Sequence, residues 1–380
     1  MENNAYTKTA IVVGAGIVGL ATARALAIRN YRVTVIERTT KAVGASIRNF
    51  GMIWPIGQPD GGLFETAALS RTIWKEICTE ANIWHDEVGS LHVANNQEEW
   101  AVLQELEHAY RDRGYQLLSK NQTKARSPFV ATDRLMGSLY SKDEMIVDPR
   151  KAIAAIPAWL SGQYGVTFVW EKAVTSIEHP VVYAGSQKWE ADLVFVCSGA
   201  DFETLYPEIY AQQPFTKCKL QMMRMGAQPD GMRIGPALCG GLSLVHYNSF
   251  KAASSLPVLK QKYEEEYPEY LKWGIHVMAA QNQEGELTIG DSHEYGMTHE
   301  PFDKAFVNQL ITDYLGSFVQ LPNTSVVETW NGIYPKLTNG GDSVVVYPED
   351  GVTIVNGLGG AGMTLSFGLC ERTVGTMGLL

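Results

Sequence analysis

The feature that most constrains this chain is a glycine motif placed between an apolar strand and a helix. Residues 10–13 form an apolar run, G-A-G-I-V-G follows at 14–19, and a helix-forming stretch comes next. In this context Gly14 permits the tight turn, Gly16 lets the backbone approach a pyrophosphate, and Gly19 lets the helix pack closely on the strand. The first turn of the helix also presents free N–H groups to a phosphate. The motif therefore predicts a dinucleotide-binding site.

An acidic residue stands where such a site places its ribose ligand. The second apolar stretch, residues 31–36, ends in Glu37, which lies 21 positions after Gly16. A carboxylate about 20 residues after the glycines accepts hydrogen bonds from a ribose hydroxyl and repels a 2′-phosphate. The ligand should therefore be FAD or NAD and not NADP.

Length, charge and cysteine content exclude several other classes of protein. The 380 residues leave room for two domains, and the net charge of -10 argues against a nucleic-acid partner. The five cysteines are scattered, with no metal-ligand spacing, and we expect reduced thiols in a cytoplasmic protein. No apolar run reaches the roughly 18 residues of a membrane span. We expect no metal site.

Three later segments should converge on the nucleotide. The glycine- and proline-containing stretch 43–59 reads as a loop that leaves the second strand at the same sheet edge. The apolar strand 191–197 ends in Ser-Gly-Ala, and strand 351–356 runs into G-L-G-G-A-G-M-T at 357–364 before a final helix. This second glycine turn at a helix N-terminus suits the negative charge of a reduced flavin, which favours FAD over NAD.

With these motifs in this order, the chain resembles the D-amino-acid oxidase family of flavoproteins, which includes glycine oxidase and monomeric sarcosine oxidase. The resemblance extends over nearly the whole chain and includes the G-I-Y-P turn at 332–335. It implies an α/β fold, with a Rossmann-type FAD-binding domain assembled from discontinuous segments and an inserted antiparallel-sheet substrate domain. We expect the FAD-binding domain at 1–85, 145–215 and 325–380. The substrate-binding domain should comprise 86–144 and 216–324.

The resemblance also implies a set of residues around a noncovalently bound FAD. They come from the two glycine turns, the acidic position, the loop after it, and the strands that follow. The expected cofactor-binding residues are Gly14, Ala15, Gly16, Ile17, Val18, Gly19, Glu37, Arg38, Ala45, Ser46, Asn49, Phe50, Gly51, Met52, Val174, Cys197, Ser198, Gly199, Gly332, Gly360, Ala361, Gly362, Met363 and Thr364.

Two departures from the family pattern bear on substrate and cofactor. Amino-acid oxidases of this group usually carry G-L-R-P, whose arginine clamps the substrate carboxylate through a bidentate contact. This chain has Tyr334 in that position, which makes an α-carboxylate substrate less expected. No cysteine stands near Tyr334 in the sequence, where sarcosine oxidases attach their flavin, so we expect noncovalent binding.

The loop 46–59 and the stretch G-D-S-H-E-Y-G at 290–296 resemble a subgroup associated with aminophosphonate breakdown. That resemblance implies a substrate such as 2-aminoethylphosphonate or an N-methyl or hydroxy relative. Candidates for binding its anionic group are Arg48, Lys217, Lys219, Arg224, Tyr247, His276 and Tyr334. Among them His276 and Tyr334 are the expected catalytic residues, while Arg48, Lys219 and Tyr247 are the expected substrate-binding residues.

The expected reaction is oxidation of a carbon–nitrogen bond by hydride transfer to the flavin, followed by hydrolysis of the imine. Oxygen or another acceptor would reoxidise the flavin. Three alternatives stay open from sequence: an amino-acid or N-methylamino-acid oxidase whose carboxylate is held by Arg48 or a lysine, a flavin-binding protein without catalysis, and a nicotinamide dehydrogenase.

Overall fold

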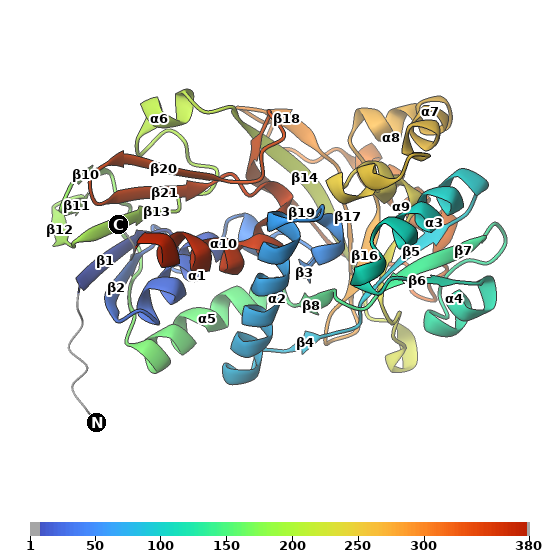
Figure 1. The fold of residues 1–380 in the computed structure, drawn as a ribbon, viewed down its shortest axis with the longest axis horizontal. Coiled ribbons are helices and arrows are strands. Elements are labelled where there is room, and N and C mark those ends of the chain that lie inside the picture. The colour runs from blue at the N-terminus through green and yellow to red at the C-terminus, as the bar shows by residue number, and fades with distance from the viewer. Residues whose placement is uncertain (1–7, 378–380) are drawn as a thin grey trace.

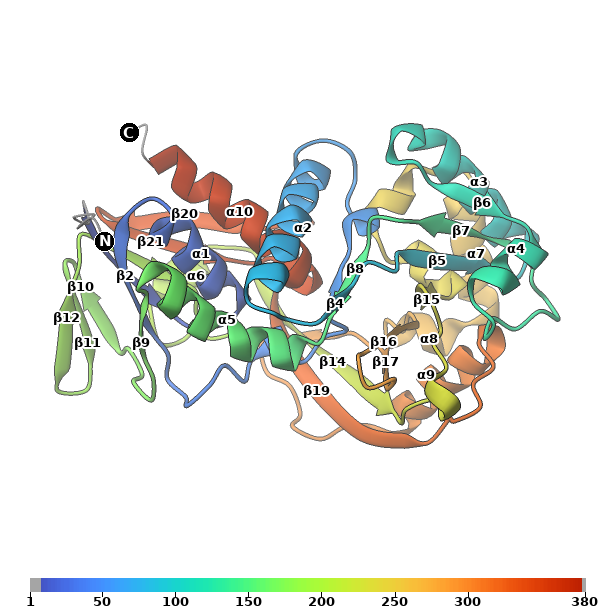
Figure 2. The same ribbon diagram turned by 90° about the horizontal axis from the view of Figure 1, so that it is seen from below.

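The computed structural model describes residues 8–377, so the ends of the expected cofactor domain, 1–7 and 378–380, lie outside the described residues. A six-stranded sheet and a nine-stranded sheet form two lobes side by side along the long axis of the molecule (Figure 1). The long strands β14 (Phe215–Met225) and β19 (Val326–Leu337) run together between the lobes (Figure 2). The fold is mixed α/β, as expected.

The six-stranded sheet is built from three separated stretches of the chain. Its order is β20 (Val344–Glu349), β21 (Val352–Asn356), β13 (Leu193–Val196), β1 (Lys8–Val13), β2 (Tyr31–Ile36) and β9 (Thr167–Val169). All neighbours pair in parallel except β20, which is antiparallel to β21. The carboxyl ends of β1, β2, β13 and β21 therefore lie along one edge, where ligands bind in sheets of this kind.

Both faces of this sheet are covered, which explains why its strands are apolar throughout. Along β1, Ala10 and Val12 pack in one hydrophobic cluster and Ile11 and Val13 in another, as strand alternation requires. The first cluster contains α1 (Ile17–Ala27), α2 (Gly62–Glu80), α5 (Pro149–Tyr164) and α10 (Gly362–Met377). The second contains α6 (Pro207–Ala211) and the antiparallel sheet of β10 (Ser176–Glu178), β11 (Val181–Ala184) and β12 (Gln187–Glu190).

The nine-stranded sheet is almost entirely antiparallel, with one parallel pair between β15 and β5. Besides β14 and β19 it contains β18 (Glu294–Gly296), β17 (Leu287–Gly290), β16 (Met278–Gln281), β15 (Ala237–Cys239), β5 (Ser90–Ala94), β7 (Gly137–Ser141) and β6 (Gln116–Leu118). Its helices are α3 (Gln97–Ala109), α4 (Lys120–Arg126), α7 (Leu256–Glu266), α8 (Pro268–Lys272) and α9 (Ala305–Phe318). β19 falls in a segment that we assigned to the cofactor domain, yet it pairs along its length with β14.

A small sheet of β3 (Met52–Ile53), β8 (Met145–Val147) and β4 (His85–Asp86) lies where the chain passes between the lobes. Within residues 8–377, no helix combines the length and apolar character needed to cross a bilayer.

Candidate active site

The first glycine turn has the close packing that its sequence predicts. Gly14 has a φ of +100°, and a Cβ on it would lie 2.5 Å from the carbonyl oxygen of Cys197. A Cβ on Gly19 would lie 1.9 Å from the carbonyl oxygen of Gly14. Only glycine fits either position, so β1, α1 and β13 come close enough to form the floor of a shared cavity.

Glu37 holds the turn from the end of β2. One carboxylate oxygen accepts a hydrogen bond from the Ala15 N–H at 2.9 Å, and the other accepts from the N–H and hydroxyl of Thr39 at 3.1 and 2.8 Å. The next residue, Arg38, forms an ion pair with Asp201. Glu37 and Arg38 both line the cavity, on the side where an adenosine ribose is expected.

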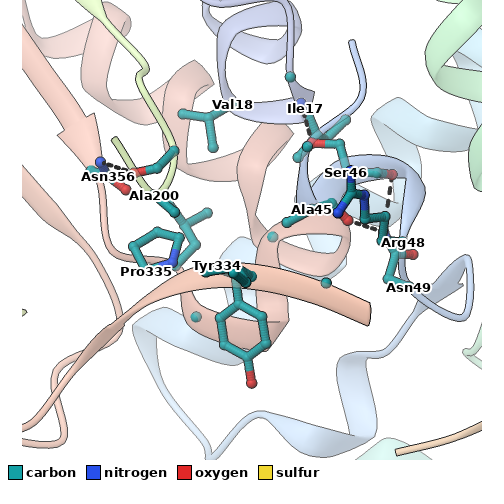
Figure 3. A pocket seen from close by; sticks show the side chains of 18 of the residues that line it. Ile17, Val18, Ala45, Ser46, Arg48, Asn49, Ala200, Tyr334, Pro335 and Asn356 are labelled. Atoms are coloured by element: carbon teal, nitrogen blue, oxygen red, sulfur yellow. Dashed lines mark hydrogen bonds between the residues drawn. The ribbon is translucent and has the colours of Figure 1, made fainter. Parts of the chain in front are cut away.

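The loop after β2 closes another side of the cavity. The Ile17 N–H at the start of α1 donates to the Ser46 hydroxyl at 2.9 Å, and the Asn49 amide donates to the carbonyl oxygens of Ala45 and Ser46 at 3.0 Å each. In Figure 3 this loop lies on the right of the pocket, and Asn356 lies on the left. The Asn356 amide donates to the Gly199 carbonyl oxygen at 2.9 Å, which ties the ends of β21 and β13 together.

These segments enclose a cavity of about 510 Å³, within the usual range for ligand sites. Eighteen of the expected cofactor-binding residues line it. They are Gly14, Gly16, Ile17, Val18, Glu37, Arg38, Ala45, Ser46, Asn49, Phe50, Val174, Cys197, Ser198, Gly199, Gly332, Gly360, Gly362 and Met363.

The six other expected cofactor-binding residues do not line this cavity. Met52, Ala361 and Thr364 line an adjoining cavity of about 300 Å³, and the Thr364 hydroxyl accepts a hydrogen bond from the Trp54 N–H at 2.9 Å. Ala15 and Gly19 lie behind the first turn. Gly51 has a packing role, because a Cβ there would meet the Val147 carbonyl oxygen at 2.0 Å.

The residues fit an FAD molecule. The glycines that face the cavity leave open space: a Cβ on Gly199 would meet nothing within 4 Å, and one on Gly362 would approach no atom closer than 3.7 Å. The N-terminal ends of α1 and α10 both face this space, which suits a pyrophosphate at one end and a negatively charged flavin edge at the other.

At the flavin end, β19 contributes Tyr334. The Tyr334 hydroxyl would lie 3.6 Å from a Cβ on Gly360, so this side chain reaches the second glycine turn. Burial raises the pKa of Tyr334 well above its ordinary value, so its hydroxyl keeps its proton and can donate a hydrogen bond. Cys218 lies directly opposite Tyr334 on β14, so a cysteine is adjacent in space although none is near in sequence; it does not line the cavity.

A cluster of three histidines, one of them His276, lines the same cavity as Tyr334. The ligand atoms of His246, His276 and His293 all lie within 4.8 Å of one another. His276 Nε2 is 3.1 Å from one carboxylate oxygen of Asp291, and His293 Nε2 is 3.7 Å from the other. Burial lowers the pKa of His276 well below its ordinary value and lowers that of His293 to about 4, so both imidazoles are neutral near pH 7.

The three imidazole rings of this cluster are packed close together. The planes of His276 and His293 are 15° apart with centroids 5.2 Å apart, and the His246 and His276 centroids are 3.8 Å apart. The three rings bring one nitrogen each to within 4.8 Å of the others, a grouping that could also hold a metal ion.

The other expected substrate-binding residues separate into two groups. Arg48 and Tyr247 line the cavity; the Arg48 guanidinium donates to the Asn331 carbonyl oxygen at 3.2 Å. Lys219 does not line it, because Leu220 and Met222 point into the cavity and strand alternation turns Lys219 to the opposite face of β14. There its ammonium donates to the Glu300 carbonyl oxygen at 2.8 Å and to the carbonyl oxygen of Phe302.

Two further cations from the sequence prediction do not line the cavity either. Lys217 pairs with Glu203 at 2.6 Å, and Arg224 pairs with Glu286 at 3.4 Å. Sequence reasoning missed His246, Asp291, His293 and Lys336, all of which line the cavity. Lys336 could have been found, since it lies two residues after Tyr334 on a strand and therefore on the same face.

Comparison with known proteins identifies the family of the chain. Residues 9–375 match the protein family described as DAO, FAD dependent oxidoreductase. Glycine oxidase from Geobacillus kaustophilus has a similar structure, with a TM-score of 0.77, 20% sequence identity, and coverage of 97% of this chain and 94% of that chain. L-proline dehydrogenase from P. horikoshii is similar with a TM-score of 0.76, 18% identity, and coverage of 97% and 92%.

A third similar structure, L-alpha-glycerophosphate oxidase from Mycoplasma pneumoniae with FAD bound, has a TM-score of 0.73 and 17% identity, and the match covers 97% of this chain and 94% of that chain. No curated protein matches the chain. The family match covers almost the full length and specifies FAD, which removes the nicotinamide alternative. The chain belongs to the DAO family of FAD-dependent oxidoreductases.

Proposed function

We propose that this enzyme oxidises the carbon–nitrogen bond of a small amine that carries an anionic group, with an aminophosphonate such as 2-aminoethylphosphonate, or an N-methyl or hydroxy relative, as substrate. The observation that carries the proposal is the side chain at the G-I-Y-P turn. Tyr334 reaches the flavin end of the cavity from the position where carboxylate-binding relatives carry arginine, and it brings a hydroxyl in place of a bidentate cation.

The bound flavin would supply the chemistry by accepting a hydride from the substrate carbon next to nitrogen. Such a transfer requires the amine without its extra proton. We assign the proton-accepting role to His276, whose ring lines the cavity and whose buried Nδ1 has no hydrogen-bond partner among residues 8–377. Nδ1 can accept a proton in the tautomer that carries its hydrogen on Nε2, the nitrogen that lies 3.1 Å from Asp291.

Tyr334 and Tyr247 would position the substrate. Burial raises the pKa of both hydroxyls well above the ordinary value, so both keep their protons near pH 7; that of Tyr247 donates to the Met278 sulfur at 3.4 Å. The Tyr247 ring lies between Trp54 and His276, with ring centroids 6.5 and 5.6 Å away. The site thus combines neutral donors with aromatic walls that exclude water from the reacting carbon.

An amino-acid or N-methylamino-acid oxidase is the second candidate, because Arg48 does line the cavity. Its guanidinium is partly used by the Asn331 carbonyl oxygen, which leaves its other nitrogens for a carboxylate. Substrate preference separates the two candidates.

Product analysis tests the proposal. Incubation with 2-aminoethylphosphonate and an electron acceptor should release ammonia and an aldehyde in equal amounts, and the N-methyl relative should release methylamine instead. Release of ammonia from glycine, or of methylamine from sarcosine, with no product from either phosphonate would support the amino-acid oxidase. A flavin that can be photoreduced but yields no product from any amine would indicate a binding protein without catalysis.

A further inference from the structure

We infer that Lys336 binds the anionic group of the substrate, and that this group is a phosphonate. The inference rests on the proposed function and names the residue that would bind the substrate anion in place of the arginine that this chain lacks. It depends on where β19 directs alternate side chains, on the absence of an ion-pair partner for this lysine, and on the neighbours that its ammonium faces.

Strand geometry places Lys336 in the same chamber as Tyr334. Side chains at positions 332, 334 and 336 of β19 share one face, and Gly332, Tyr334 and Lys336 all line the large cavity. Gly332 has no side chain to occupy this space, and Tyr334 extends toward Gly360. Lys336 is therefore the residue that brings a positive charge to this face of the strand.

The ammonium lies beside the second glycine turn. A Cβ on Gly359 would be 3.3 Å from Cδ of Lys336 and 3.7 Å from its Nζ. The lysine lines both the large cavity and the adjoining one, and His246 and Tyr247 do the same. It also faces His293, whose pKa is lowered chiefly by burial and further by the Lys336 charge. Lys336 thus lines both cavities and lies near His293, a neighbour of the proposed base His276.

Lys336 forms no ion pair within residues 8–377, although its charge acts on Asp342, whose pKa is raised by burial and lowered by the lysine. No carboxylate oxygen of the described chain lies within 4.0 Å of its Nζ, although Asp342 faces the adjoining cavity. By contrast Lys217, Lys219 and Lys304 each have a carboxylate partner. Partial burial of a cation without an ion-pair partner costs free energy, and a bound anion offsets this cost. The anionic group of a substrate would be such a partner.

The chemistry of lysine selects the kind of anion. An ammonium is a compact charge with three donors and no planar fork, so it lacks the geometric match to a carboxylate that arginine has. A phosphonate presents three oxygens in a tetrahedral arrangement, so one can contact Lys336 while others accept hydrogen bonds from His246 and Tyr247. A carboxylate has two oxygens in one plane, so it can meet fewer of these three donors at the same time.

Binding of a ligand that cannot react tests the inference apart from catalysis. Ethylphosphonate has the anion of 2-aminoethylphosphonate but no amine, and propionate is its carboxylate counterpart. Isothermal titration of the FAD-loaded protein in phosphate-free buffer should give tighter binding of ethylphosphonate than of propionate. K336M should raise the dissociation constant of ethylphosphonate by about tenfold or more, because a charged hydrogen bond is lost.

Two variants serve as controls, and flavin content and melting temperature show that each variant is folded. K336R keeps the charge and should recover most of the affinity for ethylphosphonate. K188M removes the same charge from an exposed hairpin residue and should leave the affinity within a factor of about two, as expected for a distant, screened charge.

An unchanged dissociation constant in folded K336M would overturn the inference, and so would an equal loss in K188M. Tighter binding of propionate than of ethylphosphonate by the wild type would overturn the choice of phosphonate. If ethylphosphonate binds through Lys336 but 2-aminoethylphosphonate is not oxidised, the proposed reaction fails while the anion site stands.

Discussion

A buried carboxyl group between β7 and β8 should make the stability of this protein depend on pH. Glu144 lies in the turn between β7 and β8 and is only 1% exposed. One of its oxygens accepts a hydrogen bond from the Ile56 N–H at 3.0 Å, and the other accepts from the Ser90 hydroxyl at 3.0 Å. With no cation paired to it in the described chain, burial raises the pKa of Glu144 from 4.5 to about 7.

The sign and size of the effect follow from this shift. Between pH 4.5 and pH 7 the folded protein holds the Glu144 proton more tightly than the unfolded chain does. The free energy of unfolding therefore falls as pH rises through this range, by about 3 kcal/mol when the full shift is expressed. E144Q keeps an acceptor for the Ile56 N–H but has no proton to lose, so its stability should lack this component.

Urea unfolding of the FAD-saturated wild type and E144Q at intervals from pH 5 to pH 8 measures the effect. The variant should gain stability relative to the wild type as pH rises, with the change concentrated between pH 5 and pH 7. E264Q removes the same charge from the surface and reports the effect of net charge alone. A stability difference between wild type and E144Q that stays constant with pH, or grows in the opposite direction, would refute the reasoning.

Three other predictions concern the cofactor and the proton. G19A places a Cβ 1.9 Å from the Gly14 carbonyl oxygen, so the flavin-to-protein ratio of the purified variant and its melting temperature should both fall. In the control variant G162A the new Cβ meets no atom within 4 Å, so neither the flavin-to-protein ratio nor the fold should change. E37Q keeps the hydrogen bond from Ala15 but loses the charge that a ribose hydroxyl would meet. The apoprotein of this variant should therefore bind FAD about tenfold more weakly in a flavin fluorescence quenching titration. Equal affinity of variant and wild type would show that Glu37 does not bind the cofactor. H276Q cannot take a proton from the substrate, so its rate of flavin reduction in stopped-flow experiments should rise with pH toward the pKa of the amine. The wild type should keep a high rate at lower pH. Parallel pH profiles of the two proteins would exclude His276 as the base.

The cofactor end of the site could be predicted from sequence because its signals are local. The strand, glycine turn and helix around Gly14 and Gly19, and the acidic residue at 37, each occupy one short stretch whose conformation is set by its own residues. The predicted α/β fold and the FAD cofactor are confirmed by the family match.

The substrate end was harder to predict because it is assembled from distant strands. His276 precedes β16, and Asp291 and His293 follow β17, so the pairing of these strands brings them together, while His246 comes from the separate segment after the 3-10 helix at 241–245. Lys219 was assigned to the site from its charge, but the register of β14 turns it to the other face. The alternation of side chains along β14 and β19 helps to decide which cations reach the cavity. The sequence alone does not say which of the two alternating faces of each strand is turned toward the cavity.

The central claim is that the flavin oxidises an aminophosphonate, and anaerobic mixing tests it most directly. The FAD-loaded protein is mixed without oxygen with 2-aminoethylphosphonate, its N-methyl relative, glycine or sarcosine, and the visible absorbance of the flavin is followed. The account predicts that a phosphonate bleaches the flavin and that glycine and sarcosine leave it oxidised. Bleaching by glycine or sarcosine alone would contradict the account and assign the cavity to a carboxylate substrate.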